Sequence, residues 1–235
     1  MKKPFLIIAG QSNAITRGVS GPVPAAWASG PDVQFWNGSR FEPYDTSAAT
    51  NWGPEVGYAA AWRAAGSPGG RLRIVKHAVG NTQLAPQSSY GDLGADGMDW
   101  HPSTNNSLFA ELVRKVDSAL GITPGEPELT LLWVHGEADS RLEAASKAYP
   151  EHMRIFVATL ERRLGRKLDR IALSLISLRY AEAHRERQRI AARGIKAAVI
   201  DGANYPHQSD GIHLDRTGAY RLGQDAYGFA AGMPR

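Results

Sequence analysis

The chain has 235 residues, 43% of them hydrophobic, a formal net charge of +4 and a sequence pI of about 9.4. This length suits one large α/β domain or two small ones and allows a core that hides roughly 70–75% of the unfolded chain's surface. The charge is mild and forms no basic stripe, so a nucleic-acid partner is not expected. The sequence contains no cysteine, which excludes disulfides, thiolate metal sites and cysteine nucleophiles.

The chain starts with a short apolar run behind two lysines. Lys2 and Lys3 precede the residues PFLIIA, and together they superficially resemble a signal peptide. The run is too short for the apolar region of such a peptide and leads directly into a serine motif. We therefore expect a buried strand over residues 5–9 and a cytoplasmic protein, although an exported precursor that had lost a leader would look the same. Nothing approaches the length of a membrane span, so no membrane partner is expected.

Apolar periodicity along the rest of the chain predicts strands that alternate with helices. Residues 18–54 are rich in glycine, proline and tryptophan, with a β-like piece at 33–36 and a turn signal at Asn37-Gly38. Further strands are expected over residues 71–77, 129–134, 171–176 and 197–200. Helices are expected over residues 55–65, 105–120, 141–164, 182–193 and 214–230, the third being either one helix or a pair kinked at Pro150.

This alternation is typical of a parallel sheet covered by helices on both faces. We expect a three-layer α/β/α sandwich around a mostly parallel, five-stranded sheet. Residues 1–235 should form a single domain, because neither repeats nor a linker divide the chain. Ligands bind such sheets beyond the carboxyl ends of the strands. Ser12, Gly80 and His135 each follow an expected strand closely and should converge there, and the long polar stretch 80–103 is a candidate substrate-facing loop.

Residues from the two ends of the chain have the chemistry of one active site. Gly10 permits a sharp turn that would lift Ser12 out of the end of the first strand. A serine hydroxyl becomes an effective nucleophile when a neighbouring base takes its proton and a carboxylate holds that base. Asp210 and His213, three residues apart at the expected start of the last helix, can supply both partners.

Five short blocks, in order along nearly the whole chain, resemble those of the SGNH (GDSL-like) hydrolases. Within this superfamily they resemble carbohydrate esterase family six and the sialate O-acetylesterase-like domains. The blocks are Gly10–Asn13, Asn51–Glu55, Gly80–Thr82, Trp133–Asp139 and Asp210–His213. Each block alone is a weak signal, because short motifs recur by chance. Together they imply the flavodoxin-like SGNH hydrolase fold and a serine esterase that uses no cofactor or metal.

By this resemblance, Ser12 is the nucleophile, His213 the general base and Asp210 the residue that orients the base. The oxyanion hole would use the backbone N–H groups of Ser12 and Gly80. The family's third donor is an Asn or Gln side chain, and this sequence has Ala138 and His135 at the two corresponding positions.

A neutral imidazole can donate one N–H, so His135 either replaces the missing donor or is a structural histidine. Gln11, Asn81 and Glu137 stand beside these positions and are expected at the oxyanion hole or the substrate-binding surface.

Other polar and aromatic residues admit more than one role. Glu137 and Asp139 resemble paired carboxylates, but a solvated or helix-capping role is more typical. Trp100 and Tyr90 either stack on a sugar or pack in the core or at its rim. Three further histidines lack the spacing of metal ligands, so a metal site is not expected. They are His77, His101 and His207.

The leading hypothesis is an esterase that removes small acyl groups, above all acetyl, from a small-molecule or oligosaccharide ester. A lipase or thioesterase for longer acyl chains ranks second, because the loops are polar and glycine-rich and show no apolar lid. A carbohydrate-binding protein of the same fold that has lost activity is the third hypothesis. The loss of the usual Asn or Gln donor supports this third hypothesis, whereas the presence of Ser12, Asp210 and His213 argues against it.

Overall fold

The structure is a computed structural model and describes residues 2–15, 30–44, 52–94 and 98–232. Its strands are β1 (Lys3–Gly10), β2 (Val33–Trp36), β3 (Phe41–Pro43), β4 (Leu72–Ala78), β5 (Pro127–Val134), β6 (Arg170–Ser174) and β7 (Ala198–Ile200). Its α-helices are α1 (Ser12–Ile15), α2 (Pro54–Ala64), α3 (Gln87–Tyr90), α4 (Leu108–Gly121), α5 (Glu143–Leu164), α6 (Glu182–Gly194) and α7 (Arg216–Ala230). Short 3-10 helices cover Asp139–Arg141 and Gly202–Asn204.

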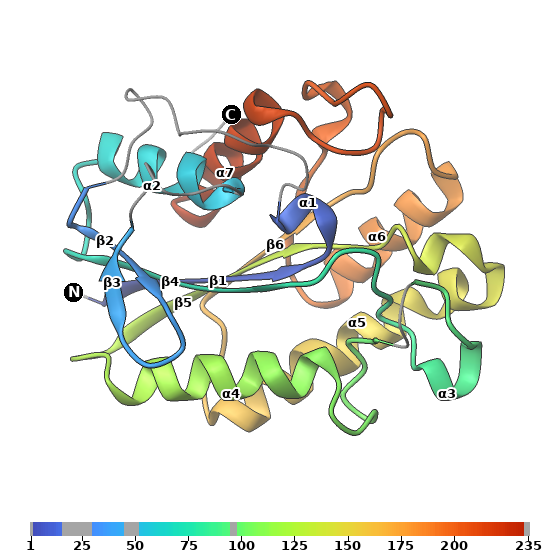
Figure 1. Ribbon diagram of the computed structural model, residues 1–235, viewed down its shortest axis with the longest axis horizontal. Coiled ribbons are helices and arrows are strands. Elements are labelled where there is room, and N and C mark those ends of the chain that lie inside the picture. Colours follow the sequence, from blue (N-terminus) through green and yellow to red (C-terminus); the bar gives the residue numbers. More distant parts are fainter. Residues whose placement is uncertain (1, 16–29, 45–51, 95–97, 233–235) are drawn as a thin grey trace.

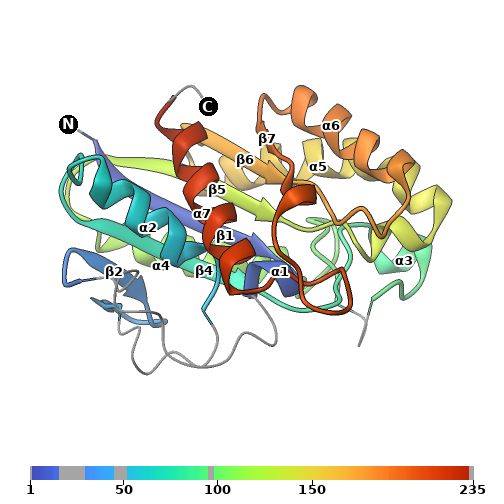
Figure 2. The same ribbon diagram turned by 90° about the horizontal axis from the view of Figure 1, so that it is seen from above.

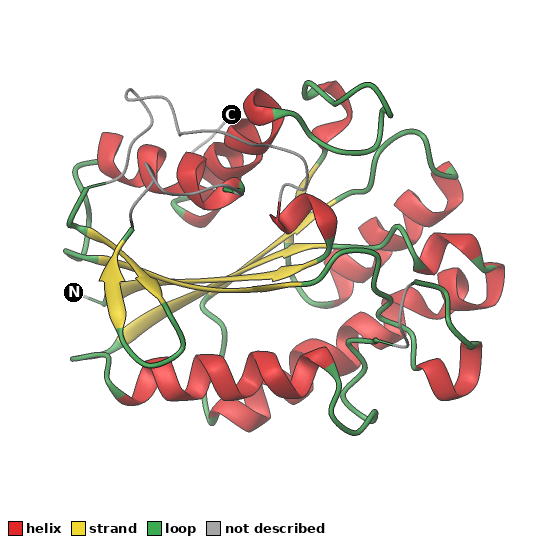
Figure 3. Cartoon of the chain, viewed as in Figure 1, coloured by secondary structure: helices red, strands yellow, loops and turns green. Residues whose placement is uncertain are grey.

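All the strands belong to one sheet in the order β3-β2-β4-β1-β5-β6-β7, which lies between layers of helices (Figure 3). Neighbouring strands are parallel except β2 and β3. Helices α2 and α7 cover one face, and α4 and α5 cover the other (Figure 1). Helix α6 packs against α5. The predicted three-layer α/β/α architecture is confirmed.

The predicted number of strands is wrong, because a hairpin extends one edge of the sheet. Strands β2 and β3 bring the sheet to seven strands among the described residues, instead of five. The β-like piece expected at 33–36 is strand β2, but β3 has only three residues, too few for apolar periodicity to identify it. The turn signal between them is real, since Asn37 N–H donates to the Arg40 carbonyl over 3.1 Å and Gly38 has φ +109°.

The central strand β1 is apolar throughout because both of its faces are covered. Phe5 and Ile7 pack in the core cluster beneath α4 and α5, whereas Leu6 and Ile8 pack in the cluster beneath α2 and α7. Such continuous apolar runs are typical of buried parallel strands. The prediction of a buried strand at residues 5–9 is therefore confirmed, and the strand begins two residues earlier.

Two helices begin later than predicted because side chains cap them. The Ser107 side chain accepts from Ala110 N–H, so α4 starts at Leu108 rather than residue 105. The Asp215 side chain accepts from Gly218 N–H in the same way, so α7 starts at Arg216. Helix α5 runs through Pro150 as one element, which decides between the two predicted alternatives. No helix of the described segments is long and apolar enough to cross a bilayer.

The register of the sheet brings three segments to one place. Gly10 at the end of β1 pairs with Ala78 of β4 on one side and with Val134 of β5 on the other. Ser12 and Gly80 follow two residues later and His135 one residue later, all beyond the same edge of the sheet. The predicted convergence of these segments is confirmed.

Candidate active site

The turn that carries Ser12 requires a glycine. Gly10 has φ +140°, and a Cβ atom at this position would lie 2.0 Å from the Val134 carbonyl oxygen. The chain therefore passes tightly over the end of β5, where Gln11 N–H donates to the same carbonyl over 2.9 Å. Helix α1 then starts at Ser12 beside the segment that leads into α7 (Figure 2).

Three side chains form a hydrogen-bonded chain at this turn. Ser12 Oγ lies 3.0 Å from His213 Nε2, although 201 residues separate them in sequence. His213 Nδ1 lies 2.6 Å from Asp210 Oδ2. The structure thus brings together a hydroxyl, an imidazole and a carboxylate in the order that acyl transfer to serine needs.

Asp210 holds His213 through a turn and not through a helix, so the expectation that these residues open the last helix is wrong. Asp210 Oδ1 accepts the backbone N–H groups of Ile212 and His213 over 2.8 and 2.9 Å, and Gly211 has φ +67°. This side-chain turn competes with a helix. It also keeps the carboxylate next to the ring of His213.

Burial by itself would raise the pKa of Asp210. The hydrogen bonds from the His213 ring and from the backbone N–H groups of His213 and Ile212 outweigh it and lower the pKa to about 2. An ionised Asp210 accepts the Nδ1–H of His213, and Nε2 is then the nitrogen that can accept the Ser12 proton.

Gly80 and Asn81 lie in the turn after β4. Val79 N–H donates to the Gly10 carbonyl over 3.0 Å, so the end of β4 is fastened to the turn before Ser12. Asn81 has φ +56° and is half-buried. Ser12 is the first residue of α1, so its own N–H has no acceptor within that helix. The predicted roles of Ser12 and Gly80 as oxyanion donors stay predictions.

His135 is fully buried in an aromatic environment. Its ring stacks on Trp133 with centroids 4.8 Å apart and meets the edge of Trp100 at 6.4 Å. Burial and the nearby His184 lower the pKa of its imidazole to about 3, so the ring is neutral at ordinary pH. Its role as the third oxyanion donor stays a prediction.

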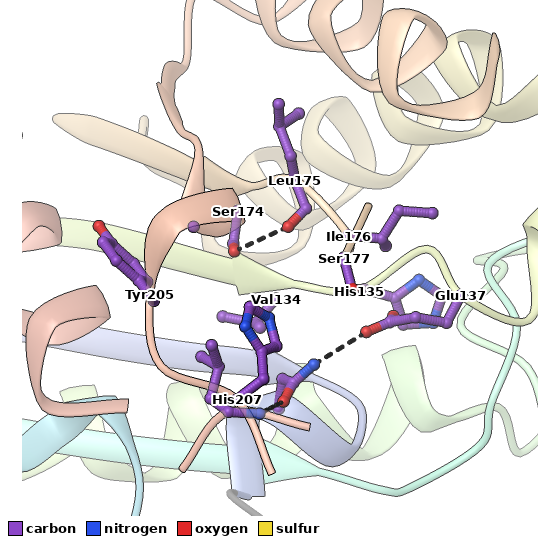
Figure 4. A pocket seen from close by; sticks show the side chains of 12 residues that line it. Val134, His135, Glu137, Ser174, Leu175, Ile176, Ser177, Tyr205 and His207 are labelled. Atoms are coloured by element: carbon purple, nitrogen blue, oxygen red, sulfur yellow. Dashed lines mark hydrogen bonds between the residues drawn. The ribbon is translucent and has the colours of Figure 1, made fainter. Parts of the chain in front are cut away.

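Glu137 and Asp139 are both buried, so the expectation of a solvated role is wrong. Glu137 Oε1 accepts from Asn13 Nδ2 over 3.2 Å, a contact drawn in Figure 4, and burial raises the pKa of this carboxyl. Asp139 accepts the backbone N–H groups of Leu84 and Ala85 over 2.9 and 2.8 Å. Gln11 is buried as well, at the turn between β1 and α1.

The two aromatic residues of the long loop differ in their surroundings. Trp100 is completely buried and donates its indole N–H to Thr82 Oγ1 over 2.9 Å, so it packs in the core and offers no face to a sugar. Tyr90 is half-buried and meets His152 edge-on. Within the described residues, no three His, Asp or Glu side chains gather as a metal site would require. The metal-free mechanism stays a prediction.

Asn13 is a residue of the site for which the sequence predicts no role. It is buried, and its side-chain amide connects the turn of Ser12 with the backbone around His213. The block Gly10–Asn13 already contained this residue. Its partners lie about 200 residues away, so no local spacing could have identified them.

Comparisons with known proteins give the family and the fold that this chain shares. A family model described as "Carbohydrate esterase, sialic acid-specific acetylesterase" matches residues 2–228. A solved structure from Arabidopsis thaliana matches with a TM-score of 0.78 and 19% identity over 99% of both chains. NanS matches with a TM-score of 0.68 and 16% identity, over 98% of this chain and 96% of NanS.

A carbohydrate acetylesterase from Xanthomonas citri matches with a TM-score of 0.67 and 14% identity, over 95% of this chain and 55% of that one. At these identities the likeness to solved structures shows a shared fold. A comparison with curated protein sequences finds no match.

The fold and the family match together define a carboxylic ester hydrolase with a three-layer α/β/α architecture. The chain belongs to the carbohydrate esterase family described as sialic acid-specific acetylesterases, because the family model covers nearly all of it. The resemblance drawn from the five sequence blocks is thereby confirmed. Carbohydrate acyl esters are the substrate class that this membership implies.

Proposed function

We propose that this protein removes acetyl groups from a carbohydrate through a covalent acyl-enzyme on Ser12. The observation that carries the proposal is the chain of hydrogen bonds from Ser12 Oγ to His213 Nε2 at 3.0 Å and from His213 Nδ1 to Asp210 Oδ2 at 2.6 Å. Family membership supports the substrate class, and the Xanthomonas citri relative is itself named a carbohydrate acetylesterase.

In the first half of the reaction, Ser12 Oγ attacks the carbonyl carbon of the ester while His213 Nε2 takes the hydroxyl proton. The tetrahedral oxyanion is stabilised by the backbone N–H groups of Ser12 and Gly80. The C–O bond to the sugar then breaks, and the sugar oxygen receives the proton from His213. Asp210 stabilises the imidazolium that exists between these two proton transfers.

In the second half, His213 takes a proton from water as the water oxygen attacks the acyl carbon. Collapse of the second tetrahedral intermediate releases acetate and returns the proton to Ser12 Oγ. All the groups in this cycle come from the protein, the ester and water.

Hydrolysis of p-nitrophenyl acetate, butyrate and octanoate by wild type and Ser12→Ala tests the proposal. The expected result is fastest turnover on acetate and a loss of about 10⁴-fold or more in Ser12→Ala. Ser118→Ala, on the exposed side of α4, is the matched control and should behave as wild type. Preference for octanoate would favour a lipase or thioesterase, and an active Ser12→Ala enzyme would refute the serine mechanism.

A further inference from the structure

Asn13 holds the base of the proposed mechanism from both sides. Its side chain is 6% exposed and lies one residue after Ser12. Nδ2 donates to the carbonyl of Ile212 over 3.1 Å, and Oδ1 accepts from the N–H of Leu214 over 2.9 Å. These two backbone groups belong to the residues immediately before and after His213. One amide therefore fixes the two peptide groups that flank the base.

The two backbone partners also determine how the amide is oriented. A carbonyl can only accept a hydrogen bond and an N–H can only donate one, so Nδ2 must face Ile212 and Oδ1 must face Leu214. Glu137 Oε1 accepts from the same Nδ2 over 3.2 Å. The buried Glu137, in the loop after β5, thus holds the amide nitrogen of Asn13, and the amide oxygen of Asn13 faces Leu214.

The segment that carries His213 needs such an anchor because it is irregular. Much of its hydrogen bonding is internal, as between Gln208 N–H and the His213 carbonyl at 2.7 Å. On the side of β6, Ser177 Oγ donates to the Gly211 carbonyl over 2.6 Å. Asn13 supplies the connection on the side of the nucleophile, where the distance between Ser12 and His213 is set.

We propose that Asn13 is a positioning residue for His213, held in turn by Glu137. It keeps Nε2 at the 3.0 Å from Ser12 Oγ that proton transfer requires. This inference rests on the proposed function, because it assigns Asn13 an effect through the base. A misplacement of about 1 Å in a catalytic group can cost about 10²-fold in rate. The expected loss on removing the amide is therefore about 10- to 100-fold in kcat, with KM little changed.

A double-mutant cycle tests the proposal on wild type, Asn13→Ala, His213→Ala and the double variant. Each protein is assayed for kcat and KM on p-nitrophenyl acetate and for the rate of Ser12 labelling by a fluorophosphonate. If Asn13 acts through His213, its removal lowers both rates in the wild-type background. In the His213→Ala background it should change the residual rates by less than about 2-fold, because residues that act as a unit are not additive.

Equal fold losses in both backgrounds would show that Asn13 is only structural and would overturn this inference. A His213→Ala enzyme with wild-type activity would overturn the proposed function instead, so the two failures are distinguishable. Asn13→Ser, whose short hydroxyl cannot reach both backbone groups, repeats the cycle if alanine prevents folding. Asn37→Ala is the matched control, since it removes hydrogen bonds from an asparagine in the exposed β2–β3 turn and should leave the rates unchanged.

Discussion

At the scale of single residues, His135 has an environment that favours packing over donation to substrate. Its ring is buried against Trp133 and Trp100, and burial keeps it neutral. We predict that His135→Ala lowers the melting temperature clearly, because truncation of a large buried side chain leaves a cavity that costs about 2–5 kcal/mol. The loss in kcat should be smaller than the 10²–10³-fold expected for an oxyanion donor.

Melting temperatures and kcat of His135→Ala and His135→Gln, measured side by side, decide between the two roles. An alanine variant with wild-type stability and a kcat reduced by about 10³-fold would make His135 the third donor after all. Strong recovery of kcat in the glutamine variant would support the same conclusion, because an amide can donate where the imidazole did.

Sequence reasoning at this scale could propose Ser12, Asp210 and His213 because their chemistry shows in short blocks, and their side chains lie within hydrogen-bond distance of one another. The expectation that Glu137 and Asp139 are solvated was wrong, because both carboxylates are buried. Their hydrogen-bond partners come from segments far away in the chain, so only the folded structure shows why burial is tolerated.

At the scale of elements, the start of the long loop is fastened to the short 3-10 helix that follows β5. Asp139 uses both carboxylate oxygens to accept the N–H groups of Leu84 and Ala85, a few residues after Gly80. An asparagine offers a single oxygen acceptor, so one buried N–H would lose its partner. We predict that Asp139→Asn lowers the free energy of unfolding by about 1–3 kcal/mol and also lowers kcat.

Urea unfolding and kinetics of Asp139→Asn check this prediction. Asp92→Asn is the control, because Asp92 is an exposed residue of the same loop whose carboxylate accepts a single backbone N–H, that of Gly94. It should stay within about 0.5 kcal/mol of wild type. Equal stability of the two variants would show that Asp139 does not anchor the loop.

The main strands and helices could be predicted because buried apolar runs and amphipathic periodicity are local properties. The segment of β2 and the turn after it could be predicted, but β3 and the pairing of the two strands could not, because both strands are short. The start of α7 was misplaced because Asp210 and Asp215 form side-chain turns before it. Capping and turn hydrogen bonds determine where helices and strands begin and end, and apolar periodicity does not detect these hydrogen bonds.

At the scale of the whole molecule, we propose that residues 1–235 fold as one domain. The support is a single sheet whose strands come from both halves of the chain, and the packing of α7 against α2 across one face.

Buried histidines should make the stability of this fold depend on pH. Burial is the main cause that lowers the pKa of His101 and the pKa values of four others. They are His77 at about 4, His135 at about 3, His152 at about 4 and His184 at about 4. In the unfolded chain each returns to about 6.5. Between about pH 4 and 6.5 the unfolded chain therefore binds more protons than the folded one, so stability rises with pH in this window.

Burial raises the pKa of Glu137 and raises that of Asp139 to about 7, so these two groups act in the opposite direction. Five groups outweigh two, and we predict that the urea concentration at the unfolding midpoint rises as the pH is raised from about 4.5 to 6.5. His152→Gln should flatten this rise, because it removes one of the five groups. A midpoint that stays constant or falls over this range would contradict the prediction.

In the proposed mechanism, Ser12 becomes acylated with His213 as its base. Mass spectrometry of the protein after incubation with a fluorophosphonate detects which residue reacts. We expect a single adduct on the peptide that contains Ser12, loss of esterase activity in step with labelling, and much slower labelling in His213→Ala. An adduct on another residue, or an enzyme that stays active when Ser12 is fully labelled, would contradict it.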